Sequence, residues 1–195
     1  MEQAEIDYLK LFRMPQAVKI TGRTSSITNS FINSIIPVVV PTSDEVQKAL
    51  SILGMTDKLV CAYCGDTSTE WDHLRPLVID KQPTGYISEI HNLVPACGKC
   101  NQSKGNKHWR DWMFGPAVLS PLTRGIADLD QRAERLAAYE EWTPPTRLDF
   151  KALVGDEVWS EHWDNYAQIV ALMKNAQITA TKIRETIKDT YLQIT

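Results

Sequence analysis

Apolar side chains recur at helical spacing in several stretches of this chain. A first helix is predicted after Thr42, because Thr42 and Glu45 form a capping-box pattern, and it should end at Gly54. Its apolar positions share one helical face: Val46, Ala49, Leu50 and Leu53. A second helix is predicted over residues 128–142, where apolar residues again follow this spacing and two consecutive prolines come soon after.

The longest periodic stretch runs from residue 157 to residue 194. Its apolar residues follow a period near 3.6: Trp159, Trp163, Tyr166, Val170, Met173, Ile183, Ile187 and Tyr191. The pattern predicts one long amphipathic helix, or two helices broken around Asn175. Such a face either packs on its own chain or joins two copies of the chain, so a homodimer is one possibility.

All four cysteines of the chain belong to two Cys-x-x-Cys pairs, Cys61–Cys64 and Cys97–Cys100. Each pair supplies two thiolates from one tight turn, and two such pairs complete a tetrahedral zinc site. Disulfides and free core thiols are the alternatives. The first residues do not resemble a signal peptide, and no apolar run approaches membrane-spanning length. We therefore expect a cytoplasmic protein without a membrane partner, where disulfides are disfavoured and the four cysteines hold structural zinc.

Four polar residues accompany the cysteine pairs: Asp72, His73, Asn92 and Asn101. Asp72-His73 precedes a Leu-Arg-Pro sequence, Asn92 precedes a leucine, and Asn101 directly follows the second pair. In this order, from about residue 61 to residue 109, the chain resembles the HNH nucleases, the ββα-metal superfamily. It departs from their pattern at Asn101, which stands where the family's last H would be.

The resemblance implies an α+β fold, with a ββα-metal catalytic core, structural zinc and mainly helical flanking segments. It also implies that His73 is the general base, that Asp72 and Asn101 bind Mg²⁺ or Mn²⁺, and that Asn92 holds the long insert in place. The chemistry agrees, because phosphodiester hydrolysis needs a base for water and a cation for the developing charge. A neutral histidine suits the first task, and carboxylate and amide oxygens suit a hard cation. Taken alone, Asn101 could equally cap a helix.

The formal net charge is −3, which does not suggest a surface coated with basic residues for DNA. Basic residues are instead concentrated in two segments without acidic residues, 10–23 and 99–110. We predict DNA contacts from five of them: Arg23, Lys99, Lys104, Lys107 and Arg110. The alternative for such a run is an ordinary solvated helix face.

Residues 24–43 carry no charged side chain at all. They are expected to be either a buried stretch packed on the core, or a loop whose hydroxyl and amide groups contact the DNA backbone or base edges. Residues 80–85 contain a proline and a glycine and are expected to form a loop between His73 and Asn92.

The chain is expected to have three parts. Residues 1–58 are expected to form an N-terminal segment that packs on the core or contacts DNA. Residues 59–114 are expected to form the zinc-containing nuclease core. Residues 115–195 are expected to form a helical C-terminal region. Glycine and proline cluster just after residue 114 and mark that boundary.

The substantial flanks favour a stand-alone, sequence-specific endonuclease of the restriction type. A phage or mobile-element nicking nuclease is the first alternative. The second is a zinc-stabilised module that binds nucleic acid without cutting it. Asp72, His73 and Asn101 argue against this second alternative, because binding alone requires none of them.

Overall fold

The computed structural model describes residues 12–194, and the chain divides into two compact units. One unit is Thr28–Glu161, and the other combines the described parts of Met1–Ile27 and His162–Thr195. The acidic first residues and Lys10, the start of one basic segment, lie outside the described residues. The candidate site lies entirely in the first of these units.

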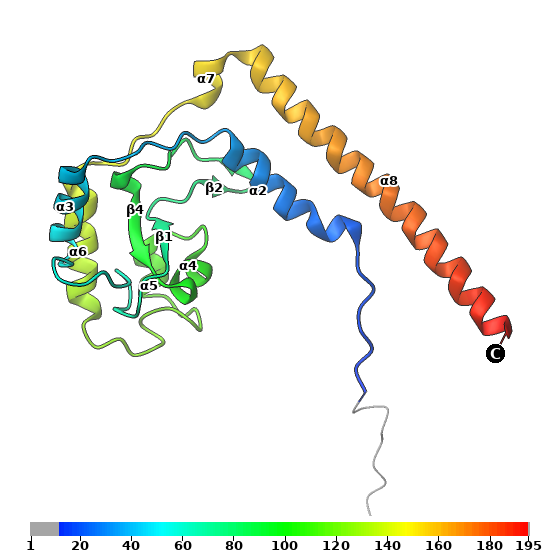
Figure 1. Ribbon diagram of the computed structural model, residues 1–195, viewed down its shortest axis with the longest axis horizontal. Coiled ribbons are helices and arrows are strands. Elements are labelled where there is room, and N and C mark those ends of the chain that lie inside the picture. Colours follow the sequence, from blue (N-terminus) through cyan, green and yellow to red (C-terminus); the bar gives the residue numbers. More distant parts are fainter. Residues whose placement is uncertain (1–11, 195) are drawn as a thin grey trace, which may run out of the picture. The chain divides into compact units, whose positions relative to one another are not determined.

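Two short antiparallel strands and a helix form the centre of the 28–161 unit. Strand β1 (Glu70–His73) pairs with β4 (Leu93–Ala96), so that His73 lies opposite Leu93. Helix α4 (Gly98–Lys104) follows β4 almost directly, and Figure 1 shows it beside the two strands. This β-β-α arrangement, with helices on both sides in the sequence, confirms the predicted α+β fold class.

A second small hairpin lies in the insert between β1 and β4. Strand β2 (Val78–Ile79) pairs with β3 (Gln82–Pro83) around a turn in which Asp80 and Lys81 have φ angles of 50° and 62°. A type I′ turn needs positive φ at both central residues, which places two non-glycine residues in the left-handed region. The stretch expected as a plain loop is therefore a hairpin, followed by the 3₁₀ turn η2 (Ile90–Asn92) before β4.

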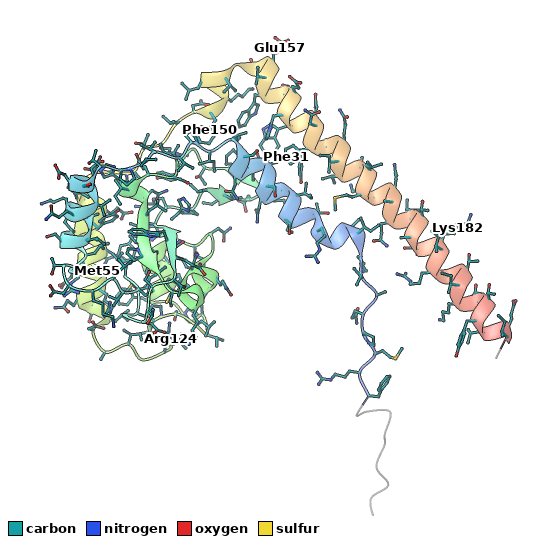
Figure 2. All side chains as sticks on the ribbon, in the orientation of Figure 1. Phe31, Met55, Arg124, Phe150, Glu157 and Lys182 are labelled. Carbon is teal, nitrogen blue, oxygen red and sulfur yellow. The ribbon has the colours of Figure 1, made fainter. Side chains whose placement is uncertain are left out.

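Two predicted helices are confirmed, and both cover the central strands. Helix α3 (Ser43–Ile52) has both hydrogen bonds of the capping box at Thr42, and helix α6 is Leu129–Trp142. They share one apolar core with the strands and both cysteine pairs; its largest fully buried apolar members are Tyr63, Leu74, Val94, Trp109, Trp112, Met113, Leu136 and Tyr139. Figure 2 shows the density of side chains there, including the labelled Met55.

Short helices complete the unit after α4. Helix α5 (Trp109–Met113) contributes two buried tryptophans to the core, and helix α7 (Phe150–Val154) begins at a residue whose side chain is buried. The basic segment 99–110 is divided between two helices, because the chain turns between α4 and α5. Gly105, at a φ of 52°, follows the last residue of α4.

The uncharged stretch 24–43 begins as a partly buried helix, so the expected loop is wrong for its first part. The 3₁₀ turn η1 (Ile20–Arg23) leads into α2 (Thr24–Ser34), and α2 buries Thr28 and Ile32. After α2 the chain extends and pairs with Ser88. The Val39 amide donates to the Ser88 carbonyl at 2.8 Å, and the Ser88 amide donates to the Pro37 carbonyl at 3.1 Å. The segment after α2 is thus tied to the insert between β1 and β4.

Helix α8 (Asp156–Ile194) is continuous, so the predicted break around Asn175 is wrong. None of its described residues is buried, and Figure 2 shows side chains along it, such as the labelled Lys182, pointing away from the helix. The Ile20 amide donates a hydrogen bond of 2.7 Å to the Gln177 side chain on this helix. Among the described residues, no helix combines the length and the apolar character needed to cross a membrane.

Candidate active site and metal centre

The four cysteines converge on one point, as predicted. Their sulfur atoms all lie within 4.8 Å of one another, and the Cys64 and Cys97 sulfurs are 3.7 Å apart. Zinc–sulfur bonds of about 2.3 Å in a tetrahedron imply sulfur–sulfur distances of about 3.8 Å. All four cysteines are free, so the disulfide alternative does not hold. A donor set made only of thiols at this spacing fits a structural zinc ion.

The backbone around the cysteines holds them in position. The Cys61 amide donates to the Asp66 carbonyl at 2.7 Å and the Gly65 amide donates to the Cys61 carbonyl at 2.8 Å, which closes a tight turn. Gly65 has a φ of 77°, a conformation that favours glycine. Arg124 donates from Nη1 to the Cys100 sulfur at 3.3 Å. This guanidinium can offset part of the negative charge that four thiolates would carry.

One open cleft, about 750 Å³ in volume, contains three of the predicted catalytic residues: Asp72, His73 and Asn101. They come from the end of β1 and the first turn of α4. The other lining residues come from α2 and its extension, from the insert between β1 and β4, and from the turn after α4: Asn29, Asn33, Ile36, Val38, Pro76, Leu77, Val78, Ser88, Gly105 and Asn106. The segment spanning α2 and its extension therefore faces the same space as the candidate catalytic residues.

His73 is the last residue of β1, and its Nε2 lies 2.8 Å from the Ser88 hydroxyl. Burial of the ring lowers the pKa of His73 to about 4, and the nearby Lys104 ammonium acts in the same direction. The imidazole is therefore neutral at pH 7. A neutral imidazole held by one hydrogen bond can accept a proton at its other nitrogen.

Asp72 is buried beneath the cleft and is bonded on both carboxylate oxygens. The Tyr63 hydroxyl donates to Oδ2 at 2.6 Å, while the Lys104 ammonium lies 3.1 Å from Oδ2 and 3.3 Å from Oδ1. Burial raises the pKa of Asp72, and the attraction of Lys104 and the hydrogen bond from Tyr63 oppose that rise. These partners fix the carboxylate in one orientation.

Lys104 occupies a different place from the one predicted for a DNA contact. Its side chain is 0% exposed, and besides Asp72 its ammonium donates to the His73 carbonyl at 2.8 Å. Burial lowers the pKa of Lys104, and the Asp72 carboxylate opposes this shift. Lys104 lies one helical turn after Asn101 and so shares the face of α4 that turns toward β1. An ammonium group enclosed in this way does not meet phosphates in solvent.

Asn101 lies in the first turn of α4, and its amide is oriented by Glu70. The Asn101 Nδ2 donates to the Glu70 carboxylate at 2.5 Å. Glu70 and Asp72 are two residues apart on β1 and so project from the same face of the strand. With Nδ2 used in this bond, the Oδ1 of Asn101 is the amide atom left to accept a bond or bind a cation.

Asn92 is fully buried and joins two separate parts of the chain. Its Oδ1 accepts from the Arg75 amide at 2.7 Å, and its Nδ2 donates to the Arg75 carbonyl at 3.1 Å and the Ile87 carbonyl at 3.2 Å. The residues just after His73 are thereby bonded to the end of the insert. These bonds have the geometry that a loop-holding role requires.

The other predicted DNA-contacting residues are exposed. Lys99 lies on α4, Lys107 lies in the turn between α4 and α5, and Arg110 lies on α5 with its guanidinium 5.1 Å from the Trp109 ring centre. Arg23 lies on η1, in the other unit of the chain. Lys99, Lys107 and Arg110 are therefore exposed basic residues close to Asn101 in the sequence.

Sequence reasoning missed three residues that contact the candidate catalytic groups: Tyr63, Glu70 and Ser88. Tyr63 lies inside the first Cys-x-x-Cys pair, and Glu70 shares a strand face with Asp72, so a strand-alternation argument could have found Glu70. Ser88 lies 15 residues after His73 and carries no local signal.

Comparison with known proteins agrees with this geometry for part of the chain. Residues 61–107 match the family model described as HNH endonuclease. The chain is also 30% identical over 95 residues to the CRISPR-associated endonuclease Cas9 of Corynebacterium diphtheriae, a match that covers 47% of this chain and 8% of that relative. No solved structure matches the chain. The matched segment contains both cysteine pairs and all four predicted catalytic residues, which supports an HNH nuclease domain at residues 61–107.

Proposed function

We propose that this chain is a metal-dependent endonuclease that hydrolyses DNA phosphodiester bonds at specific sequences, as a restriction-type enzyme does. The observation that carries the proposal is the cleft in which Asp72, His73 and Asn101 meet. The similarity of residues 61–107 to HNH endonucleases supports the same chemistry.

His73 is the proposed general base. When Nε2 carries the proton and donates to the Ser88 hydroxyl, Nδ1 has a free lone pair for a proton from water. The attacking water then gains nucleophilic character as it approaches phosphorus. Asn92, through its bonds to the chain after His73, is proposed to keep the ring aimed into the cleft.

Asp72 and Asn101 are the proposed ligands of Mg²⁺ or Mn²⁺. A carboxylate has about four acceptor sites, so Asp72 keeps capacity for a cation alongside Tyr63 and Lys104. Asn101 offers Oδ1 because Glu70 holds its Nδ2. A cation bound here would stabilise negative charge on the phosphate oxygens and the leaving oxygen. Lys99, Lys107, Arg110 and Arg23 are proposed to contact DNA phosphates.

Plasmid cleavage tests this function directly. Purified, zinc-loaded protein is expected to convert supercoiled plasmid to nicked and linear forms with Mg²⁺ or Mn²⁺, and to leave it intact in EDTA, because two protein ligands hold a cation only weakly. Elemental analysis after the EDTA treatment serves as the control that zinc is retained. Full cleavage in chelator with zinc still bound would exclude the proposed cation. Binding of DNA without cleavage in any metal would favour the non-catalytic module.

The pH dependence of cleavage tests the environment of His73. Because the pKa of His73 is lowered to about 4, the ring remains an unprotonated base well below neutral pH. We expect kcat/KM to fall by less than about twofold between pH 7.5 and pH 5.5, whereas a histidine with the ordinary value of about 6.5 would lose roughly tenfold. An apparent pKa near the ordinary value, measured with saturating metal, would contradict this environment.

Double-strand cleavage is proposed to use two copies of the chain, joined by the Trp159–Tyr191 face of α8. The apolar side chains of Ile183 and Ile187 on this helix are 55% and 64% exposed. A two-fold dimer would present one His73 to each strand of a palindromic site. Sedimentation at micromolar concentration, with and without DNA, is expected to show a dimer. The plasmid assay is expected to give the linear form. A monomer in both conditions that only nicks would favour the phage or mobile-element alternative.

A further inference from the structure

Helix α2 and its extension form one wall of the cleft that holds His73. Asn29 and Asn33 on α2 line this cleft together with Ile36 and Val38. All four residues belong to the same compact unit as β1 and α4. This wall is outside residues 61–107, the segment similar to HNH endonucleases.

The rotation of α2 about its axis explains why two asparagines face the cleft. Thr28 and Ile32 are buried and are four residues apart, so they fix one face of α2 against the protein. Asn29 and Asn33 are also four residues apart and lie one position further round the helix, and both are exposed. The two amide side chains therefore form a pair on the cleft side of α2.

Ser88 holds this wall in a defined position relative to His73. Its backbone amide and carbonyl bond to Pro37 and Val39, at 3.1 Å and 2.8 Å. Its hydroxyl lies 2.8 Å from Nε2 of His73. Ser88 therefore contacts both the extension of α2 and the proposed base. These bonds fix the position of the wall relative to His73.

The wall differs in charge from the exposed basic residues Lys99, Lys107 and Arg110. Residues 24–43 contain no charged side chain, so the wall adds no net charge for attracting phosphates. An asparagine amide presents a donor and an acceptor side by side, which matches the N6 and N7 edge of adenine. A neutral amide pair beside the cutting site is suited to discriminating bases.

We propose that Asn29 and Asn33 are specificity-determining residues that bond to base edges of the DNA next to the scissile phosphate, with adenine as the preferred base. This rests on the proposed nuclease function and adds to it the residues that select the site. The Ser88 contacts set how far from the cut the selected base lies.

The test compares cut sites rather than rate alone. Wild-type protein and the Asn29→Ala/Asn33→Ala double variant are incubated with Mg²⁺ and a pool of duplexes carrying a randomised segment, and the cut ends are sequenced. Wild-type ends are expected to favour adenine at fixed positions near the cut, and the double variant is expected to lose this preference by roughly tenfold or more. Asn165→Ala is the matched control, an exposed asparagine on α8, and should keep the wild-type pattern.

Each outcome separates the two proposals. If the double variant cuts with the wild-type base preference, whether at full rate or uniformly more slowly, the asparagines do not select bases and the inference is wrong while the nuclease function stands. Wild-type ends without base preference overturn the inference in the same way. If wild-type protein cuts nothing with Mg²⁺ or Mn²⁺, the proposed function fails and the inference fails with it. Thermal melting of both variants shows whether each remains folded, and alanine at exposed helical positions is expected to maintain stability.

Discussion

His73→Ala is expected to lower the rate of DNA cleavage by about 10²-fold or more, because deleting a general base removes the group that activates water. Folding should be retained, since the ring lies at the end of β1 and its side chain bonds to the Ser88 hydroxyl at the edge of the open cleft. DNA binding should also be retained, because the proposed phosphate contacts are elsewhere. The measurement is single-turnover plasmid cleavage at neutral pH with saturating Mg²⁺.

Two controls accompany this variant. Asn165→Ala replaces an exposed residue of α8, in the other unit, and should cleave at the wild-type rate. Thermal melting and DNA binding in EDTA should give the same values for His73→Ala as for wild type. Retention of the full cleavage rate by His73→Ala would remove His73 from the proposed mechanism.

Cys97→Ser is expected to abolish zinc binding and to unfold the 28–161 unit. Zinc binds small structural sites with an apparent free energy of about 10–16 kcal/mol. This binding stabilises the folded state, because the unfolded chain has no preformed zinc site. Cys97 is also the N-cap residue of α4, so its substitution is expected to disturb the helix that carries Asn101. Elemental analysis should find one zinc per wild-type chain and less in the variant, together with a lower melting temperature.

Lys99→Ala is the matched control for this experiment. Lys99 lies two residues from Cys97 and is exposed, so its removal should leave zinc content and melting temperature unchanged. Active wild-type protein without zinc would show that the four thiols have another role.

The sequence predicted the helices best where local signals were strong. The capping box at Thr42 and the apolar spacing within residues 128–142 depend only on nearby residues, and both helices formed as expected. Helix α2 was missed because its serines, threonines and asparagines give weak periodicity and only Thr28 and Ile32 are buried. The β2–β3 hairpin was missed because its turn uses Asp80 and Lys81 instead of glycine.

The candidate site divides in the same way. The cysteine spacing and the Asp72-His73 sequence are local, and they predicted both the thiol cluster and two residues of the cleft. The positions of Lys104 and Ser88 depend on contacts between residues distant in the sequence, 32 residues for Lys104 with Asp72. A lysine within a basic run has the same local pattern whether it is solvated or buried against a carboxylate.

The buried pair of Asp72 and Lys104 restricts how this protein can change over generations. Removing one member of a buried ion pair typically costs 3–5 kcal/mol, because the other charge is left without a partner, whereas replacing both can be nearly neutral. Single substitutions at either position therefore pass through an unstable intermediate, and the two positions are expected to vary together among homologues. Loss of cleavage in Asp72→Ala would in turn mix a missing cation ligand with a damaged fold, so a cleavage assay of this variant has to be accompanied by thermal melting.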